Sequence, residues 1–190
     1  MQNYKLGEYI RQRRLDLGLT QEQVCAGICE SVTLSRFENG KQTPSRNRIN
    51  AILQRLGLPD DRYYALVTPE ELEIEALKKE IVSCNALKCV EEGFDKISRL
   101  EKIAKPDDQI TQQFILRSKV LLGGLDKRYS NDERIQMLLQ AIRMTIPDFQ
   151  LDKIEDFLFT LDEMKLVNQI GNAYSLSGDN ENCLLYTSDA

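Results

Sequence analysis

Apolar side chains recur along the first third of the chain at intervals of three and four residues, the spacing of an amphipathic α-helix. No run alternates between apolar and polar residues in the way a half-buried β-strand does. The spacing predicts five helices, over residues 5–17, 21–28, 31–38, 46–56 and 58–66. Their inward-facing side chains are predicted to be Leu6, Ile10, Leu17, Val24, Cys25, Ile28, Leu34, Phe37, Ile49, Ile52, Leu53 and Leu56.

Residues with special backbone preferences mark the ends of these helices. Gly18, Gly40 and Gly57 each follow a helical stretch, at the position where a left-handed residue commonly ends a helix. Thr20 followed three residues later by Gln23 is a capping box, which predicts a helix that starts after Thr20. Residues 1–66, called the head below, are therefore predicted to be a set of short helices with sharply defined ends.

The rest of the chain, called the tail below, has the same spacing over longer stretches. Predicted helices cover residues 70–83, 86–104, 110–122, 131–145 and 161–177. In the first of these, Leu72, Ala76 and Ile81 are predicted to face inward. The pair Gly123-Gly124 is predicted to end the third helix, and Gly93 marks a possible turn. The predicted fold class is all-α, with helical hairpins in the tail.

The composition excludes several kinds of active site. The 190 residues include no histidine, which removes the commonest general base and the commonest metal ligand. The five cysteines lack zinc-ligand spacing and are predicted to be reduced thiols. The sequence has neither a run of 18 apolar residues nor the apolar segment of a signal peptide. We therefore expect a cytoplasmic protein that is not an enzyme and uses no metal, cofactor or membrane.

Charge is distributed unevenly along the chain. The whole carries 25 basic and 30 acidic side chains, a net charge of −5. Residues 1–64, by contrast, carry ten basic and seven acidic side chains. A mildly basic head on an acidic tail favours a polyanionic partner, such as nucleic acid, for the head.

Several residues of the head stand at fixed offsets from one another. They are Gly18-Leu19-Thr20-Gln21-Glu22, Leu34-Ser35-Arg36-Phe37-Glu38-Asn39-Gly40-Lys41 and Pro44-Ser45. This set resembles the Xre/Cro-like family of DNA-binding domains over about residues 5–58. The resemblance implies a five-helix, lambda-repressor-like helix-turn-helix domain over residues 1–66, whose third helix enters the major groove of double-stranded DNA. It also implies a homodimer that reads two half-sites, and a structural salt bridge between Arg14 and Glu38.

The outer face and the start of the third helix are predicted to meet the DNA. Arg36 suits a bidentate contact to guanine or a contact to phosphate, Val32 suits a thymine methyl, and Ser31 can donate or accept. Thr33 is open between a DNA contact and packing on the first helix, and Arg13 is expected to be solvated. The predicted DNA-binding residues are Gln21, Ser31, Val32, Ser35, Arg36, Lys41 and Arg46, of which Gln21, Lys41 and Arg46 are assigned to the DNA backbone.

The segment between the second and third helices is one residue shorter than in many Xre/Cro-like domains. It reads Cys25-Ala26-Gly27-Ile28-Cys29-Glu30-Ser31. This variant resembles the head of the RNPP family, the bacterial Rgg- and PlcR-like regulators that sense peptide pheromones in quorum sensing. That resemblance implies a tail of tetratricopeptide-like (TPR-like) repeats that binds a short signalling peptide and dimerises.

One stretch of the tail carries the spacing of such a repeat. Val167, Ile170, Gly171 and Tyr174 stand where the first helix of a tetratricopeptide repeat has its characteristic residues, with valine in place of tryptophan. A generic helical bundle is the alternative. The predicted function is a sequence-specific transcription regulator controlled by a bound peptide. The alternative function is a helical-repeat adaptor or antitoxin without regulatory DNA binding.

The last eight residues stand apart from the repeat pattern. Residues 183–190 read Cys-Leu-Leu-Tyr-Thr-Ser-Asp-Ala, which resembles the translation of a sequencing adapter. The TPR-like region is therefore assigned to residues 67–182. Because the end of a repeat array needs a capping element, we expect the sequence to be truncated at its C-terminus and the full protein to continue with further repeats.

Overall fold

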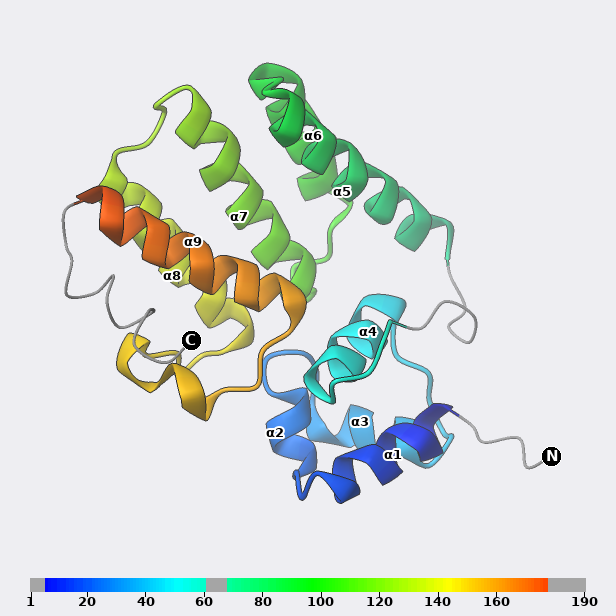
Figure 1. Ribbon diagram of the computed structural model, residues 1–190. Coiled ribbons are helices and arrows are strands. Elements are labelled where there is room, and N and C mark those ends of the chain that lie inside the picture. Colours follow the sequence, from blue (N-terminus) through cyan, green and yellow to red (C-terminus); the bar gives the residue numbers. More distant parts are fainter. Residues whose placement is uncertain (1–5, 61–67, 178–190) are drawn as a thin grey trace. The chain divides into compact units, whose positions relative to one another are not determined.

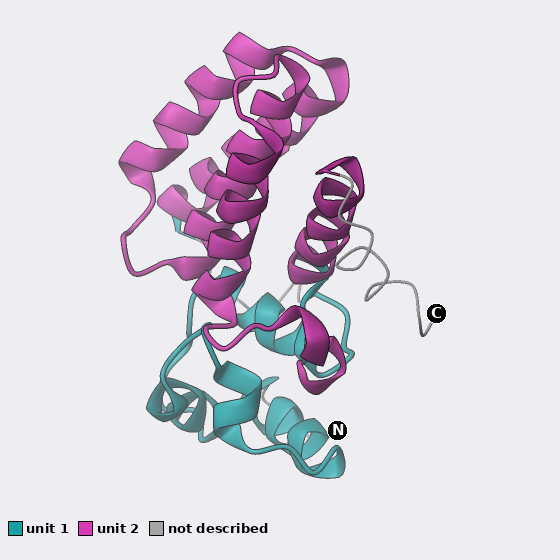
Figure 2. Cartoon of the chain, turned by 90° about the vertical axis from the view of Figure 1, so that its left-hand side faces the viewer, with its two compact units in different colours: residues 1–68, 158–161 teal, residues 69–157, 162–190 magenta. Residues whose placement is uncertain are grey.

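The structure, a computed structural model, describes residues 6–60 and 68–177 (Figure 1). Within these ranges every regular element is a helix, which confirms the predicted all-α class. None of these helices is long and apolar enough to cross a membrane. Contacts between residues divide the chain into two compact units (Figure 2). Unit 1 holds residues 1–68 and 158–161, and unit 2 holds residues 69–157 and 162–190.

Unit 1 is built from short helices whose ends agree with the local sequence signals. The helices are α1 (Leu6–Asp16), α2 (Gln21–Cys25), α3 (Ser31–Glu38) and α4 (Arg46–Arg55). The Thr20 side chain accepts a hydrogen bond from the Gln23 amide, and the Gln23 side chain accepts one from the Thr20 amide. The predicted capping box is therefore confirmed. Residues 58–60 are not helical, and the rest of the helix predicted over 58–66 lies outside the described residues.

The left-handed glycines predicted at the helix ends are confirmed. At the end of α3, Gly40 has φ +68°, and its amide donates a hydrogen bond to the Phe37 carbonyl (2.9 Å). This bond satisfies one of the carbonyls that the last turn of a helix leaves open. Gly18 and Gly57 adopt the same conformation after α1 and α4. Three helices of unit 1 thus end two residues before a left-handed glycine.

The core of unit 1 includes a very close approach of α1 to α3. A Cβ atom built on Gly7 of α1 would overlap the main-chain carbonyl of Phe37. Leu17, predicted to face inward, is exposed because α1 ends at Asp16 and the chain turns away there. The predicted inward side chains that are fully buried include Ile10, Val24, Leu34, Ile49 and Ile52.

Unit 2 is a series of helices in which neighbours in the sequence pack on one another. The elements are α5 (Pro69–Leu87), α6 (Val90–Ile103), α7 (Gln109–Leu125), α8 (Asn131–Thr145), the 3-10 helix η1 (Leu151–Asp156) and α9 (Leu161–Ser177). The main contacts join α5 with α6, α6 with α7, and α7 with α8. The five α-helices were predicted, and the 3-10 helix was not. The residues assigned to the adapter-like segment lie outside the described residues.

The predicted inner face of α5 is confirmed at Ile81 and wrong at Leu72 and Ala76. Leu72 is 58% exposed and Ala76 is also exposed, whereas Ile74, Leu77 and Ile81 are buried in the core that α5 shares with α6 and α7. Apolar residues occur on more than one side of this helix, so spacing alone allowed two faces. Packing against α6 selected the face that carries the larger side chains.

Glycines that were predicted to interrupt helices lie inside them instead. Gly93 is in α6, where a Cβ atom would come within 2.6 Å of a methyl carbon of Leu122. Gly123 and Gly124 are in α7, which continues to Leu125. Because glycine has no Cβ atom, neighbouring side chains approach closely at Gly93 and Gly123. These two glycines therefore serve packing rather than helix termination.

Alanine at Gly123 is expected to destabilise unit 2, whereas alanine at Gly124 is not. A Cβ atom at Gly123 would overlap the ring of Tyr129, and overpacking of this kind costs about 1–3 kcal/mol. A Cβ atom at Gly124 would come within 3.2 Å of the guanidinium of Arg134, the end of a long side chain rather than main chain or a ring. Alanine is also better than glycine in a helix by about 0.5–1 kcal/mol. Urea denaturation followed by circular dichroism measures both variants. Equal stabilities would contradict the packing role of Gly123.

Candidate nucleic-acid interface

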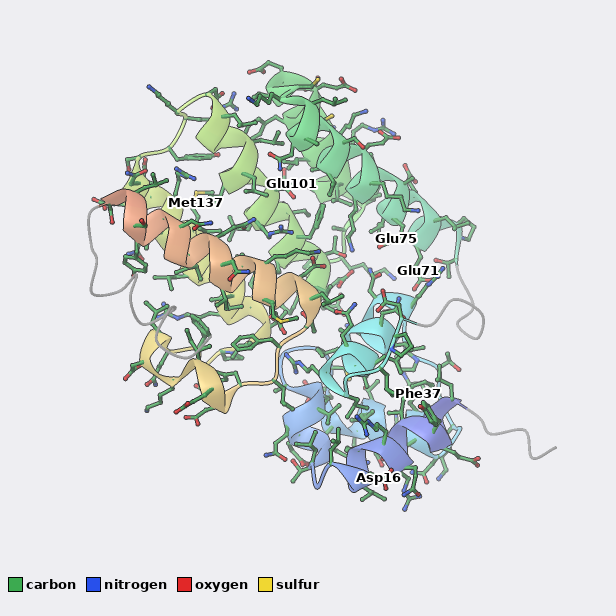
Figure 3. All side chains as sticks on the ribbon, viewed as in Figure 1. Asp16, Phe37, Glu71, Glu75, Glu101 and Met137 are labelled. Atoms are coloured by element: carbon green, nitrogen blue, oxygen red, sulfur yellow. The ribbon has the colours of Figure 1, made fainter. Side chains whose placement is uncertain are left out.

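Helix α3 has one face in the core and the other in solvent. Leu34 and Phe37 are buried and hold the helix in place, and Figure 3 labels Phe37. On the other side Val32 is 57% exposed, and Arg36 is exposed as well. Residues four apart on a helix are neighbours on its surface. An apolar group and a guanidinium group are thus presented together on an anchored helix.

The remaining predicted contact residues border this exposed pair or follow it. Ser31, Thr33 and Ser35 of α3 are half-buried. Lys41 is exposed just after α3, and Arg46 is half-buried at the first position of α4, so both flank the loop between these helices. No three histidine, cysteine, aspartate or glutamate side chains come together as metal ligands in residues 6–60 and 68–177. The arrangement is a surface of separate polar, basic and apolar contacts.

The carboxylate of Glu38 connects the first three helices. Arg14 of α1 donates two hydrogen bonds to it, from Nε (2.7 Å) and Nη2 (2.9 Å), and Gln21 of α2 donates a third from Nε2 (2.7 Å). The Arg14 and Glu38 side chains are only 9% and 1% exposed, so the ion pair is buried, as the resemblance implied. Its hydrogen bonds raise the pKa of Arg14. Gln21 therefore braces α3 from the inside.

Two arginines outside the predicted contact set donate hydrogen bonds to main-chain carbonyls. The buried Arg55 of α4 donates from Nη1 to the carbonyls of Val24 (3.2 Å) and Ala26 (2.6 Å) at the end of α2. A cation is favourable there because the last carbonyls of a helix carry partial negative charge. Arg13, expected to be solvated, donates from Nε to the Leu56 carbonyl at the end of α4 (3.1 Å). The sequence signal for a structural role of Arg55 was its position beside the apolar face of α4.

The segment between α2 and α3 is a tight turn that fixes where α3 begins. The Ile28 amide donates to the Cys25 carbonyl (2.9 Å), and the Cys29 amide donates to the same carbonyl (3.0 Å). Between Cys25 and Ile28, Ala26 has φ −48° and ψ 124°, and Gly27 has φ +65°. These angles describe a type II β-turn, whose third position favours glycine. The early glycine in this shortened segment is therefore required by the turn.

Comparison with known proteins agrees with this geometry. Residues 5–66 match the family profile of the helix-turn-helix domain. No curated protein matches the chain. A similar solved structure is Bacillus thuringiensis PlcR in complex with the peptide PapR7 and DNA, with 22% sequence identity and a TM-score of 0.52. The similarity covers 96% of this chain, which spans 62% of the PlcR chain. The head is therefore a helix-turn-helix domain, and the fold of the chain is similar to that of PlcR.

Proposed function

We propose that this helix-turn-helix protein is a sequence-specific DNA-binding transcription regulator whose head reads the major groove with α3. The observation that carries the proposal is the exposed pair Val32 and Arg36 on a helix whose opposite face is buried. The major groove of B-DNA is about 12 Å wide and admits one such helix. The similar protein PlcR was solved in complex with DNA, which supports the same partner here.

Each predicted contact residue has a distinct role in this proposal. Arg36 donates to the edge of a guanine, and Val32 packs on a thymine methyl. The hydroxyls of Ser31 and Ser35 bond to bases or phosphates beside them. Lys41 and Arg46 contact phosphates on either side of the α3–α4 loop, while Gln21 bonds the DNA backbone through groups not used by its bond to Glu38.

We further propose that the protein acts as a homodimer and that a short peptide bound by the tail controls it. One head offers few base contacts, so specificity needs two half-sites about 34 Å apart or a multiple of that.

PlcR was solved with the peptide PapR7, which supports a peptide ligand. In the tail Arg117 of α7 donates to Gln169 of α9 (3.1 Å), so polar groups join these two helices. Short synthetic peptides that raise the unfolding temperature of the full chain would support this role.

Salt dependence of DNA binding by the full chain tests the proposed function. Each Lys or Arg contact to a phosphate releases counterions, so log K against log salt falls with a slope of about −0.9 per contact. We expect a steep negative slope for a DNA sequence selected from a random pool, and weaker binding to unselected DNA. A slope near zero would favour the alternative, a helical-repeat adaptor or antitoxin that does not bind DNA.

Replacing Arg36 with alanine is expected to weaken binding to the selected DNA by about 1–3 kcal/mol, because a bidentate contact to guanine is lost. Preference for guanine at one position of the site should also relax. Arg11→Ala is the matched control, since Arg11 is an exposed arginine on α1 to which the proposal assigns no DNA contact. Fluorescence anisotropy with labelled DNA measures both variants. Equal affinity of the Arg36 variant and the unmodified protein would remove Arg36 from the interface.

A further inference from the structure

Two thiols lie at the turn that leads into α3. Cys25, the last residue of α2, is 3% exposed, whereas Cys29 is half-buried, and both are free cysteines. The hydrogen bond from the Cys29 amide to the Cys25 carbonyl places the two residues one turn of chain apart. The guanidinium of Arg55 lies on the carbonyls of the same turn. A partly accessible thiol and a buried thiol therefore lie on the turn whose carbonyls Arg55 binds.

The surroundings of the two sulfur atoms make them chemically different. The neighbouring Cys25 thiol lowers the pKa of Cys29, and the nearby charges of Arg48 and Arg55 lower it further, against the effects of burial and Glu30. Cys29 and burial raise the pKa of Cys25, whose thiol donates to the Glu22 carbonyl (3.9 Å). Cys29 is thus the better nucleophile of the pair, because the thiolate is the reactive form of cysteine.

We infer that Cys29 and Cys25 are a peroxide-reactive thiol pair that closes to a disulfide within the chain. In the first step the Cys29 thiolate attacks one oxygen of hydrogen peroxide, the O–O bond breaks, hydroxide leaves, and Cys29 becomes a sulfenic acid. In the second step the Cys25 sulfur attacks that sulfur. The S–S bond forms, the S–O bond breaks, and the Cys25 proton leaves with hydroxide as water. Two thiols and one peroxide thus give one disulfide and two waters.

The product would change the turn that positions α3. A disulfide holds its two Cβ atoms at about 3.5–4.5 Å, a tighter limit than two free thiols across a turn must obey. Closing the bond therefore tightens the segment just before Ser31, the first residue of α3. The expected effect on DNA, which rests on the proposed function, is at least a tenfold loss of affinity that a reducing agent reverses.

The chemistry is tested on the full chain with the other cysteines, Cys84, Cys89 and Cys183, replaced by serine. After treatment with hydrogen peroxide, mass spectrometry should show the loss of two hydrogen atoms from the peptide that holds both Cys25 and Cys29. Dithiothreitol should restore the original mass. Adding Cys29→Ser should abolish the loss, and iodoacetamide should label Cys29 before Cys25 in the reduced protein. Persistence of both free thiols, or cross-links only between chains, would overturn the inference.

Affinity for the selected DNA is measured in parallel on the reduced and oxidised protein. If the reduced protein fails to bind any DNA, the proposed function fails while the disulfide result stands. If the disulfide forms and affinity is unchanged, the turn does not transmit the oxidation to α3, and the expected effect on DNA is wrong. Loss of affinity in the Cys29→Ser variant after peroxide treatment would assign the effect to another group.

Discussion

Replacing Glu38 with alanine is expected to destabilise the head by about 3–5 kcal/mol, the usual effect of removing one partner of a buried ion pair. The variant leaves the Arg14 guanidinium buried without its counter-charge, and it also removes the acceptor of the Gln21 amide. Because the three side chains come from α1, α2 and α3, the loss should be felt across the whole head. Amide hydrogen exchange in α1 and α3, combined with urea denaturation, measures the effect.

Two further variants separate the charge effect from a general loss of packing. Glu8→Ala removes an exposed carboxylate on α1 and should change stability by less than about 0.5 kcal/mol. The double variant Arg14→Met with Glu38→Leu replaces the pair with apolar groups and should recover much of the stability lost by Glu38→Ala. A loss below 1 kcal/mol for Glu38→Ala would show that the pair does not anchor α3.

Alanine at Gly7 is expected to destabilise the head by about 3 kcal/mol, at the upper end of the range for overpacking. The atom that a Cβ would overlap is the main-chain carbonyl of Phe37, which cannot rotate away as a side chain can. Either α1 or α3 must shift, so DNA affinity should fall together with stability. Hydrogen exchange of α3 amides and anisotropy with the selected DNA measure the two effects.

The neighbouring residue provides the control for Gly7. Glu8 is exposed on the same turn of α1, so Glu8→Ala places the same methyl side chain there without a steric clash. It should leave both stability and DNA affinity nearly unchanged. If Gly7→Ala were as stable as Glu8→Ala, the contact between α1 and α3 would have to be looser than the structure indicates.

The head was the more predictable part because its structure depends on short-range signals. Gly40 has a conformation that few other residues adopt, and Thr20 with Gln23 forms a capping box within three residues. The exposure of Val32 and Arg36 also followed from periodicity, since the apolar positions of α3 leave one clear outer face. Local chemistry and the helical repeat therefore predicted both the helix ends and the exposed face of α3.

Long-range packing accounts for what the sequence did not predict. Gly93 and Gly123 were predicted to be turn residues. Glycine is required there because Leu122 and Tyr129 pack against these positions, and that packing is a property of the folded chain. The acceptors of Arg55 are main-chain carbonyls about 30 positions earlier, so no spacing rule could identify them. Such contacts depend on the path of the chain rather than on the identity of the partner residues.

The buried network around Glu38 has a consequence for how such a head can diversify. Arg14, Gln21 and Glu38 hold α3 from the inside, whereas Val32 and Arg36 point outward and contribute nothing to that network. In the proposed interface, target choice belongs to Val32 and Arg36, whereas stability belongs to Arg14, Gln21 and Glu38. Under that proposal, gene duplicates can exchange Val32 and Arg36 and acquire a new target sequence without first having to compensate for a weakened fold.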